Sequence, residues 1–358
     1  MKILVISLAG NGDTLFATPL IHELRVNFPD ATIDALVRWR GAKDLLDNNP
    51  HLDTVHQKNL VSDSKIGGLK FLGKLWWSGY DVSINTFPQS RRHYRLAARV
   101  VNAPVRISHE YECSRAFDRR LVNKTIPQDY SRHAVENNLA LLSLLDMKPR
   151  LSQHRYELFL TDTERAWAAD FVARQNIYWR PRMGIHTGSG DTKNLALRRW
   201  PLENYIELVR HLRKKEPGLA VLFFGGPQEG ADHEKIQSAL GGESLFFPKT
   251  ENLRQAAALI EKCDIFLSVD TALMHLAAAM KVKGQVVIET PTWNKPIEPY
   301  GNPFALVKNP AVAGRNLEFY RYDGGEIKGT REELARCMAS VTVEDVQATI
   351  ERVLSKSI

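Results

Sequence analysis

The stretch MKILVISLAGNGDTLFATPLIHELRVNF, residues 1–28, contains an apolar run, a glycine-containing turn and a helical apolar stripe, in that order. Residues 3–8 are aliphatic and rich in β-branched side chains, which is typical of a buried strand. After the turn at Gly10 and Gly12, apolar residues recur at the spacing of one helix face, at Leu15, Phe16, Leu20, Ile21, Leu24 and Phe28. The stretch therefore predicts a strand, a loop and a helix, the repeating unit of a parallel α/β sheet.

The same alternation returns in two series along the chain. In the first half, strand patterns at residues 31–37 and 80–84 precede helical patterns at residues 43–46 and 94–101. In the second half, strands are expected at residues 182–186, 220–224, 265–269 and 285–288, with helices at residues 255–263 and 273–280. We therefore expect an α/β protein with two Rossmann-like, doubly wound domains.

The length of 358 residues exceeds what one hydrophobic core usually serves and fits two domains. We expect the first domain to span residues 1–165 and the second to span residues 178–335, with a polar, proline-containing region at residues 147–154 before the switch. A last amphipathic helix at residues 342–356 begins after a Thr342 cap. We expect this helix to pack back towards the first domain.

The composition excludes several classes of protein. The apolar start is too short for a signal peptide, and no run of about eighteen apolar residues could cross a bilayer. The cysteines, Cys113, Cys263 and Cys337, are odd in number and widely spaced, so they suggest neither disulfides nor a zinc site. We expect a cytoplasmic protein. Its net charge of +7 favours an anionic partner, which could be nucleic acid, an acidic lipid surface or a phosphorylated substrate.

Residues 10–14 follow the first strand, and ligands of doubly wound sheets bind at the carboxyl ends of strands. Gly12 permits a tight turn, and Asp13 places a carboxylate at the mouth of the expected cleft, where it could serve as a base for an acceptor hydroxyl. A second interpretation makes Asp13 the N-cap of a helix that starts at Thr14. Leu15 replaces the third glycine of a dinucleotide fingerprint, so a redox role has little support.

The segment GIHTGSGDTKNLALRRW, residues 184–200, is a second candidate site. A strand ends in small residues, and cations follow: Thr187, Gly188, Ser189, Lys193, Arg198 and Arg199. Small residues with nearby cations suit phosphate groups. The alternative is an ordinary loop with a solvated basic face.

The segment SVDTALMHLAAA, residues 268–279, is a third candidate, in which a strand turns into an alanine-rich helix. Thr271 and the free backbone N–H groups of the helix start could hold a diphosphate. His275 lies one helical turn later on the same face, although a half-buried core histidine is the alternative. The following loop, residues 289–296, could shape a sugar or base pocket or simply connect two elements.

Two other patterns do not support a function. Residues 68–74 have the spacing of a phosphate-binding Walker loop, but Leu75 stands where Ser or Thr is required and no strand leads into the segment. The chain has no Asp-x-Asp pair, no HExxH motif and no paired Cys/His cluster. We therefore expect no dedicated metal site.

Taken together, the four candidate regions resemble the bacterial heptosyltransferases, the ADP-heptose:lipopolysaccharide transferases of glycosyltransferase family 9. Residues 10–37 look like the N-terminal signature of that family and residues 186–212 like its donor loop. Residues 268–282 look like its diphosphate-binding turn, and residues 290–301 like its proline-containing loop. The resemblance implies a GT-B fold, with two domains facing across a cleft, acceptor on the first and nucleotide-sugar on the second. It also implies inversion at the anomeric carbon without a metal or other cofactor.

The resemblance implies a role for each candidate residue. Asp13 would be the general base, with Gly12 and Thr14 beside the acceptor. Asp270 and His275 would hold the donor turn and contact the nucleotide-sugar. The leaving diphosphate would be met by Thr187, Gly188, Ser189, Thr271, the backbone of Ala272, and a cation that is either Lys193 or Arg198. Ala272 departs from the family, which often has glycine there.

Basic residues crowd the later part of the first domain, and Arg91 and Arg92 follow a strand end there. An anionic glycolipid or glycan acceptor, such as the lipopolysaccharide inner core, would dock on them, with peripheral contact to the cytoplasmic face of the inner membrane. Two alternatives stay open. One is a nucleotide-sugar epimerase or phosphorylase on the same scaffold. The other is a basic nucleic-acid-binding protein, disfavoured because no recognised binding module is present.

Overall fold

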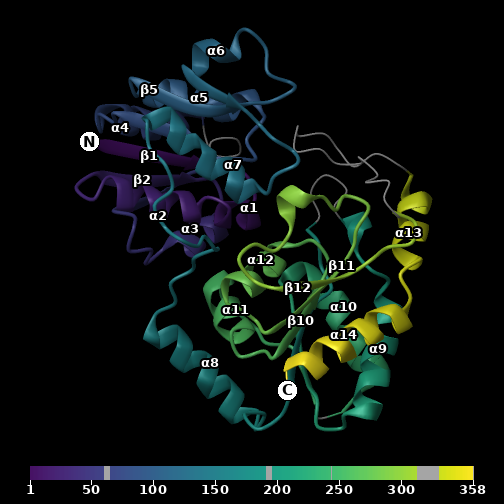
Figure 1. The fold of residues 1–358 in the computed structure, drawn as a ribbon. Helices are drawn as coiled ribbons and strands as arrows, with labels where there is room; N and C mark the ends of the chain where they lie inside the picture. Colours follow the sequence, from purple (N-terminus) through teal and green to yellow (C-terminus); the bar gives the residue numbers. More distant parts are fainter. Residues whose placement is uncertain (60–64, 191–195, 243, 313–329, 358) are drawn as a thin grey trace. The chain divides into compact units, whose positions relative to one another are not determined.

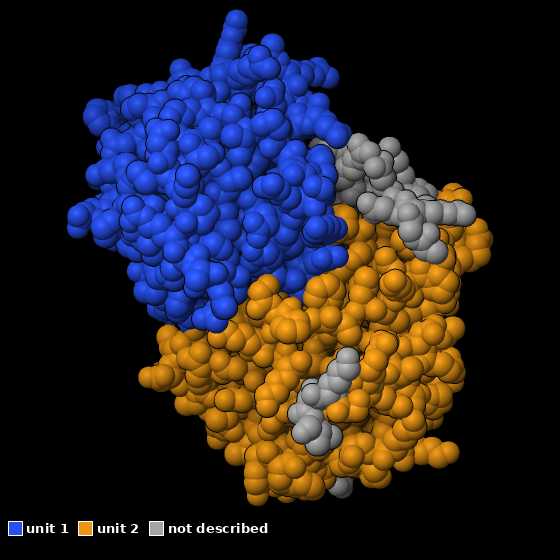
Figure 2. Space-filling model, in the orientation of Figure 1, with its two compact units in different colours: residues 1–159, 295–300, 321–325 blue, residues 160–294, 301–320, 326–358 orange. Residues whose placement is uncertain are grey.

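The computed structural model describes residues 1–59, 65–190, 196–242, 244–312 and 330–357, which form two compact units. The described residues of unit 1 are 1–59, 65–159 and 295–300, and those of unit 2 are 160–190, 196–242, 244–294, 301–312 and 330–357 (Figure 2). The division falls between residues 159 and 160, inside the stretch predicted for the first domain. The short segment 295–300, which the sequence prediction assigned to the second domain, belongs to unit 1.

Unit 1 contains a six-stranded parallel sheet in the order β3-β2-β1-β4-β5-β6. Its strands are β1 (Lys2–Ser7), β2 (Thr32–Val37), β3 (Thr54–Gln57), β4 (Val82–Asn85), β5 (Val105–Glu110) and β6 (Lys124–Pro127). The first strand lies in the middle and pairs with both β2 and β4. The prediction of a parallel sheet is therefore confirmed, and the order reverses between β1 and β4.

The reversal puts the helices of unit 1 on both faces of its sheet, because parallel crossovers are right-handed. One set consists of α1 (Asn11–Leu15), α2 (Thr18–Asn27), α3 (Arg40–Leu46) and α7 (Ala134–Ala140), followed by the 3-10 helix η1 (Leu141–Leu145). The other consists of α4 (Lys65–Trp77), α5 (Arg92–Val101) and α6 (Asp118–Leu121), with α5 packed between its two neighbours (Figure 1). This second layer matters for the surface of unit 1.

Unit 2 repeats the architecture with a six-stranded parallel sheet in the order β12-β11-β10-β7-β8-β9. Its strands are β7 (Arg182–His186), β8 (Ala220–Phe224), β9 (Leu245–Phe246), β10 (Ile265–Ser268), β11 (Gly284–Ile288) and β12 (Phe304–Val307). The order reverses between β7 and β10, which are hydrogen-bonded neighbours. Both domains are doubly wound, as predicted.

The helices of unit 2 cover both faces of its sheet (Figure 1). They are α8 (Asp162–Arg174), α9 (Leu202–Lys215), α10 (Gly230–Leu240), α11 (Leu253–Ile260), α12 (Ala272–Ala279), α13 (Arg331–Ala339), α14 (Val343–Ser357) and the 3-10 helix η3 (Pro227–Glu229). The 3-10 helix η4 (Lys295–Ile297) lies in the segment that belongs to unit 1. α8 packs against α11, where Arg254 forms an ion pair with Glu164 at 2.5 Å.

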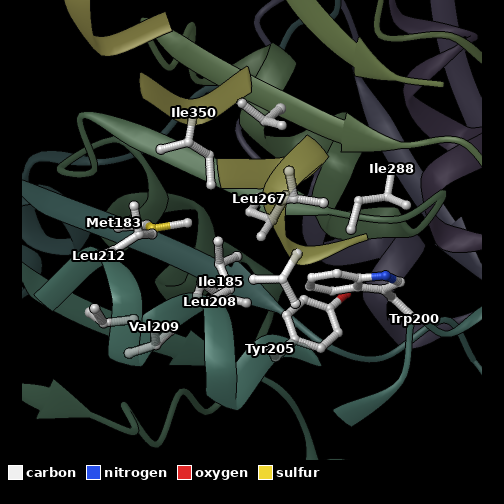
Figure 3. Close-up of a cluster of buried hydrophobic side chains, with 14 of the residues drawn as sticks. Met183, Ile185, Trp200, Tyr205, Leu208, Val209, Leu212, Leu267, Ile288 and Ile350 are labelled. Atoms are coloured by element: carbon white, nitrogen blue, oxygen red, sulfur yellow. The ribbon is translucent and has the colours of Figure 1, made fainter. Parts of the chain in front are cut away.

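The core of unit 2 lies between its sheet and the α9 layer (Figure 3). Met183 and Ile185 of β7 meet Leu208 of α9, and all three are fully buried. Trp200 packs edge-on against Tyr205 at a ring distance of 4.8 Å, and its indole N–H donates to the Val341 carbonyl at 2.9 Å. This hydrogen bond ties the loop before α9 to the C-terminal segment.

The last helix, α14, packs on unit 2, whereas the sequence prediction directed it towards the first domain. It contacts α9, β11 and β12. Its apolar stripe explains the choice, because Val346 and Ile350 are buried in the same core cluster as Met183. Figure 3 shows Ile350 in this cluster. The helix thus completes the hydrophobic core of the second sheet.

Among the described residues, no helix is long and apolar enough to span a membrane.

Candidate active site

The predicted site residues lie at the points where the strand order of each sheet reverses. In unit 1, residues 10–14 follow β1 and residues 86–92 follow β4, its neighbour. In unit 2, residues 187–190 follow β7 and residues 269–275 follow β10, its neighbour. Ligands of doubly wound sheets bind at this position, because the loops of the two neighbouring strands diverge there. Each unit therefore has one candidate half-site.

Asp13 lies in the first turn of α1, which begins at Asn11. The interpretation of Asp13 as the N-cap of a helix starting at Thr14 is therefore wrong in detail, because Gly10 occupies the cap position. The Asp13 Oδ2 atom accepts the backbone N–H of Gly10 at 2.7 Å, and the Thr14 hydroxyl donates to the Gly10 carbonyl at 3.2 Å. These bonds hold the partly buried carboxylate in one orientation. Gly12 is buried within the same turn.

Two arginines, one from each of the loops after β2 and β4, act on Tyr94 together with Asp13. Burial raises the pKa of Tyr94, the charges of Arg91 and Arg38 act against that rise, and the Asp13 carboxylate adds to it. We call Asp13, Arg38, Arg91 and Tyr94 the Asp13 group. It combines a carboxylate with two cations, which suits an anionic ligand that carries a hydroxyl.

Sequence reasoning found Asp13 and Arg91 but missed Arg38 and Tyr94. One signal was available for Arg38. It directly follows the strand at residues 32–37, and that strand pairs with β1. Arg92 takes another role. Its Nε atom lies 3.6 Å from Asp118 Oδ1, and Arg95, which is almost fully buried, pairs with the same oxygen at 2.9 Å. Arg92 is thus held by Asp118 at the surface of unit 1.

The second half-site contains an unusual concentration of buried polar side chains. Arg198 forms a short ion pair with Asp270 and donates to the Thr292 hydroxyl at 3.2 Å. His186 Nδ1 lies 3.1 Å from Thr271 Oγ1, within hydrogen-bonding distance. We call Asp270, Thr271, His275, His186 and Arg198 the Asp270 group, and each of its members is at most 7% exposed. Buried polar groups are costly unless paired, so this concentration indicates a functional role.

The start of α12 takes the shape that the sequence predicted. Thr271 is the N-cap, and its hydroxyl accepts the backbone N–H of Met274 at 3.3 Å. Ala272 is the first helical residue, where alanine is favourable and glycine is not needed. His275 lies on the buried side of the helix, 4% exposed. The backbone N–H groups of this first turn can serve an anion.

Titration of the Asp270 group follows from its burial. Burial raises the pKa of Asp270, and the Arg198 guanidinium opposes part of that rise. Burial, followed by the Arg198 charge, lowers the pKa of His275 to about 3. Burial, followed by the charges of Arg199 and His233, lowers the pKa of His186 to about 3. Both imidazoles are neutral near pH 7 and can act there as hydrogen-bonding groups.

The loop after β7 is packed too tightly to carry a side chain at Gly188. A Cβ atom there would lie 2.4 Å from Glu229 Oε1 and 2.9 Å from His186 Nε2. Glu229 is 5% exposed, accepts the Gly226 N–H at 2.8 Å and lies 3.4 Å from Arg199 Nη2. The sequence analysis named Arg199 among the cations of this segment, but it missed the partner Glu229, which lies at the end of η3 in a stretch without a motif.

Thr187 and Ser189 are buried on either side of Gly188. The Thr187 hydroxyl makes no hydrogen bond to any of the residues that the structure describes. The loop then turns at Gly190, whose φ of +75° lies in the left-handed region that favours glycine. Lys193, the other predicted cation, lies outside the described residues.

One group of possible metal ligands occurs in unit 1 among the residues that the structure describes. One ligand atom each from His22, His51 and Glu157 lies within 4.8 Å of the others. His22 Nδ1 already lies 2.8 Å from Glu157 Oε1, and the two imidazole rings stack at 3.8 Å with planes 13° apart. Because His22 already contacts Glu157 directly and the rings stack, we interpret this group as a packed, hydrogen-bonded cluster. Its members are too far apart in the sequence for a motif search to find.

Comparison with known proteins supplies the family. The sequence model of glycosyltransferase family 9 (heptosyltransferase) matches residues 78–316. Lipopolysaccharide heptosyltransferase 3 of Escherichia coli is 25% identical over 294 residues, covering 75% of this chain and 78% of that protein. The family 9 glycosyltransferase from Veillonella parvula has a TM-score of 0.78 at 18% identity, covering 99% of this chain and 97% of that one. The E. coli ADP-heptose lps heptosyltransferase II has a TM-score of 0.72 at 20% identity, covering 99% of both chains.

The family match covers two thirds of the chain, and the two structures share its fold from end to end. The predicted GT-B fold is therefore confirmed, as is the resemblance on which it was based. The match also decides against a nucleic-acid-binding protein. The chain belongs to glycosyltransferase family 9, the heptosyltransferase family, and is a glycosyltransferase enzyme.

Proposed function

We propose that this enzyme transfers a heptose from ADP-heptose to the inner core of lipopolysaccharide, with inversion and without a metal. The names of its relatives support the donor and the acceptor, since one is a lipopolysaccharide heptosyltransferase and another an ADP-heptose lps heptosyltransferase. The observation that carries the chemistry is the Asp13 group. It combines a held carboxylate with two arginines that act on the same tyrosine, Tyr94, at the reversal point of the first sheet.

Asp13 is proposed as the general base. Its carboxylate removes the proton of the acceptor hydroxyl while that oxygen attacks the anomeric carbon from the side opposite the diphosphate. The bond from the anomeric carbon to the diphosphate oxygen breaks, and ADP leaves. Arg38 and Arg91 bind the anionic groups of the acceptor and hold its hydroxyl within reach of Asp13. Arg92 would contribute less, because Asp118 already pairs with it.

The Asp270 group is proposed as the donor half-site. The first N–H groups of α12, together with the hydroxyls of Thr187, Ser189 and Thr271, hydrogen-bond the diphosphate and stabilise the charge that develops on it. A phosphate oxygen would give the Thr187 hydroxyl the partner it lacks among the described residues. Asp270 and His275 keep the turn in place and contact the nucleotide-sugar.

The cation for the diphosphate remains a choice between Lys193 and Arg198. The structure favours a smaller part for Arg198, because Asp270 neutralises its charge within the buried pair. We therefore expect Lys193→Met to lower affinity for ADP more than Arg198→Met does. A larger loss in the Arg198 variant, measured by calorimetric titration, would reverse this assignment.

The test of the proposal separates binding from transfer. In Asp13→Asn, ADP-heptose affinity should change little, whereas transfer to a lipopolysaccharide acceptor should fall by about 10²–10⁴-fold. Asp47→Asn is the matched control, since Asp47 is a surface carboxylate of unit 1 that pairs with Lys43. Retained turnover in Asp13→Asn would refute the role as base. Addition of a chelator should leave the wild-type rate unchanged if no metal takes part.

Two further measurements test the donor and the reaction type. Titration with ADP, UDP and GDP should show preference for ADP, and binding of none of the three would contradict the donor half-site. Incubation with ADP-heptose alone should leave the sugar unchanged apart from slow hydrolysis. Conversion of the donor to an isomer without any acceptor would favour the epimerase alternative.

For the location of the enzyme, we propose the cytoplasm, at the cytoplasmic face of the inner membrane.

A further inference from the structure

The helix α4 exposes an unusual number of large apolar side chains. Ile66 is 69% exposed, Leu69 67%, Trp76 45% and Trp77 81%. The opposite side of the same helix packs into the core through Leu75, which is fully buried. The helix is therefore apolar on both sides, although one side meets only solvent. Exposed apolar patches of this kind mark interaction sites in proteins that otherwise fold normally.

The two neighbouring helices continue the exposed apolar surface. Leu96 of α5 is 50% exposed, and Phe117, which caps α6, is 51% exposed. α4, α5 and α6 lie in one layer over the same face of the first sheet (Figure 1). We call the outer side of this layer the α4–α6 face.

Positive charge is interleaved with these apolar side chains. The exposed cations of the three helices, among the residues that the structure describes, are Lys70, Lys74, Arg92, Arg99, Arg119 and Arg120. The three helices contain a single carboxylate in that part of the chain, Asp118, and it is buried against Arg95. Arg92 is paired with Asp118, and Arg119 with Glu110 of β5 at 3.1 Å. The α4–α6 face is thus cationic as well as apolar, chiefly on α4 and α5.

A shallow groove runs between α4 and α5. It has a volume of about 530 Å³ and is lined by Leu69, Gly73, Trp76, Val100, Arg99 and Asn102. A Cβ atom at Gly73 would meet nothing within 4 Å, so packing does not require glycine at this position. The absence of a side chain there leaves the groove open. Arg99, at one end, donates to the Asn102 side chain at 2.7 Å. Apolar side chains and the Arg99 guanidinium therefore line the same groove.

We propose that the α4–α6 face docks on an anionic lipid bilayer. Ile66, Leu69 and Trp77 would enter the boundary between headgroups and acyl chains, where tryptophan is favoured because it is amphipathic. Lys70, Lys74 and Arg99 would contact lipid phosphates. A protein partner is the weaker fit, because lysine is depleted from the core of protein interfaces while here two lysines lie among the exposed apolar residues of α4.

Docking through this face would serve the Asp13 group. α5 begins directly after Arg91, so one end of this helix belongs to the Asp13 group while its exposed side belongs to the docking face. An acceptor anchored in the bilayer could then present its sugar to Asp13 while its lipid remains in the membrane. Only this last step rests on the proposed function, since docking itself needs neither donor nor acceptor.

Co-sedimentation of the full chain with vesicles tests the proposal. Wild type should bind phosphatidylcholine vesicles that contain phosphatidylglycerol, and should bind pure phosphatidylcholine about ten-fold less well. The double variants Leu69→Ser/Trp77→Ala and Lys70→Glu/Lys74→Glu should each lose about ten-fold in binding to the anionic vesicles. The controls are Trp179→Ala, a 59% exposed tryptophan of unit 2, and Lys214→Glu at the end of α9. Both controls should bind like wild type.

Three outcomes would overturn the proposal. Wild type could fail to bind anionic vesicles, or the controls could lose as much binding as the α4 variants. The third is concentration-dependent dimerisation that Leu69→Ser/Trp77→Ala abolishes, which would assign the face to a second copy of the chain. Turnover on a soluble glycan acceptor should be equal in wild type and in this variant. Vesicle binding without any transfer would refute the proposed function and leave the docking face intact.

Discussion

At the scale of single residues, the second half-site depends on a charge pair that is almost sealed from water. Arg198 and Asp270 are each 7% exposed, and they lie 72 residues apart in the chain. Removing one partner from such a pair leaves the other charge buried and unpaired, which costs more than the pair itself contributes. Asp270 therefore has a structural task in addition to any contact with the donor.

We expect Asp270→Asn to lower the free energy of unfolding by about 3–5 kcal/mol, because Arg198 stays charged without a counterion. Asp170→Asn is the control, since Asp170 forms an exposed pair with Arg174, and it should cost at most about 0.5 kcal/mol. Urea unfolding of both variants measures the difference. The double variant Arg198→Met/Asp270→Leu should recover most of the stability. Equal losses in Asp270→Asn and Asp170→Asn would contradict the argument.

Gly188 is a second position at which a single added atom, a Cβ, should change the donor half-site. Gly188→Ala should displace the Glu229 carboxylate, break its contact with Arg199 and lower affinity for ADP by about ten-fold or more, because a 1 Å shift misplaces the loop. The matched control is Gly226→Ala in the adjacent loop, where an added Cβ atom meets only Glu229 Oε2 at 3.8 Å. Calorimetric titration compares the two variants. Unchanged affinity in Gly188→Ala would show that Glu229 moves aside freely.

At the scale of elements, the Thr271 hydroxyl has two tasks in the turn from β10 into α12. Thr271 caps the helix through the Met274 N–H and lies against His186 of the neighbouring strand β7. The cap stabilises the helix whether or not a ligand is bound. The bond to β7 in addition connects the two loops that form the donor half-site.

Thr271→Val should lower stability by about 1 kcal/mol, because it removes the cap, and should also weaken ADP binding. Thr271→Ser keeps the hydroxyl and should retain both properties. Thermal unfolding and calorimetric titration of the two variants test this. If valine and serine behave alike, the hydroxyl has neither of the proposed tasks.

At the scale of the whole molecule, both units contain buried histidines that are neutral when the protein is folded. In unit 1, burial lowers the pKa of His109 to about 4, and its Nε2–H donates to the Asn137 carbonyl at 2.9 Å. In unit 2, His186 and His275 have pKa values of about 3 for the same reason. The unfolded chain binds protons on these groups near pH 6.5, where the folded chain does not. Above pH 6.5 these histidines are neutral in both states and do not favour unfolding. As pH falls towards 4, protons bind to the unfolded chain first, so the free energy of unfolding decreases.

His109 allows this to be measured outside the candidate site. Between about pH 7.5 and pH 5, protonation of an unfolded histidine against a folded pKa of about 4 costs about 2 kcal/mol. In His109→Gln, the loss of unfolding free energy over that interval should be smaller by this amount. Urea unfolding at both pH values gives the comparison, and identical pH dependence in wild type and His109→Gln would contradict it.

Much of the fold and part of the site could be predicted because their signals are local. The alternation of strand and helix patterns depends on side-chain periodicity within a few residues, so both doubly wound sheets were predictable. The positions of Asp13, Thr187 and Thr271 were predictable as well, since each directly follows a strand pattern. The sequence also predicted that a helix starts close to Thr271, whereas its capping role was found only in the structure. The interpretation that started the first helix at Thr14 placed that start three residues too late.

The tertiary structure alone decided which distant residues meet. The order of the strands brings Arg38 and Asp13 to the same tyrosine, Tyr94, pairs Arg198 with Asp270 and places Glu229 against Gly188. No pattern within any of these segments specifies its partner, because such contacts depend on how whole elements pack. The same is true of α14, whose apolar stripe was evident although its choice of unit 2 was not. The sequence by itself thus determined the elements and the strand ends that carry the chemistry. Packing decided the charge balance at each half-site and left α4 with an uncovered apolar side.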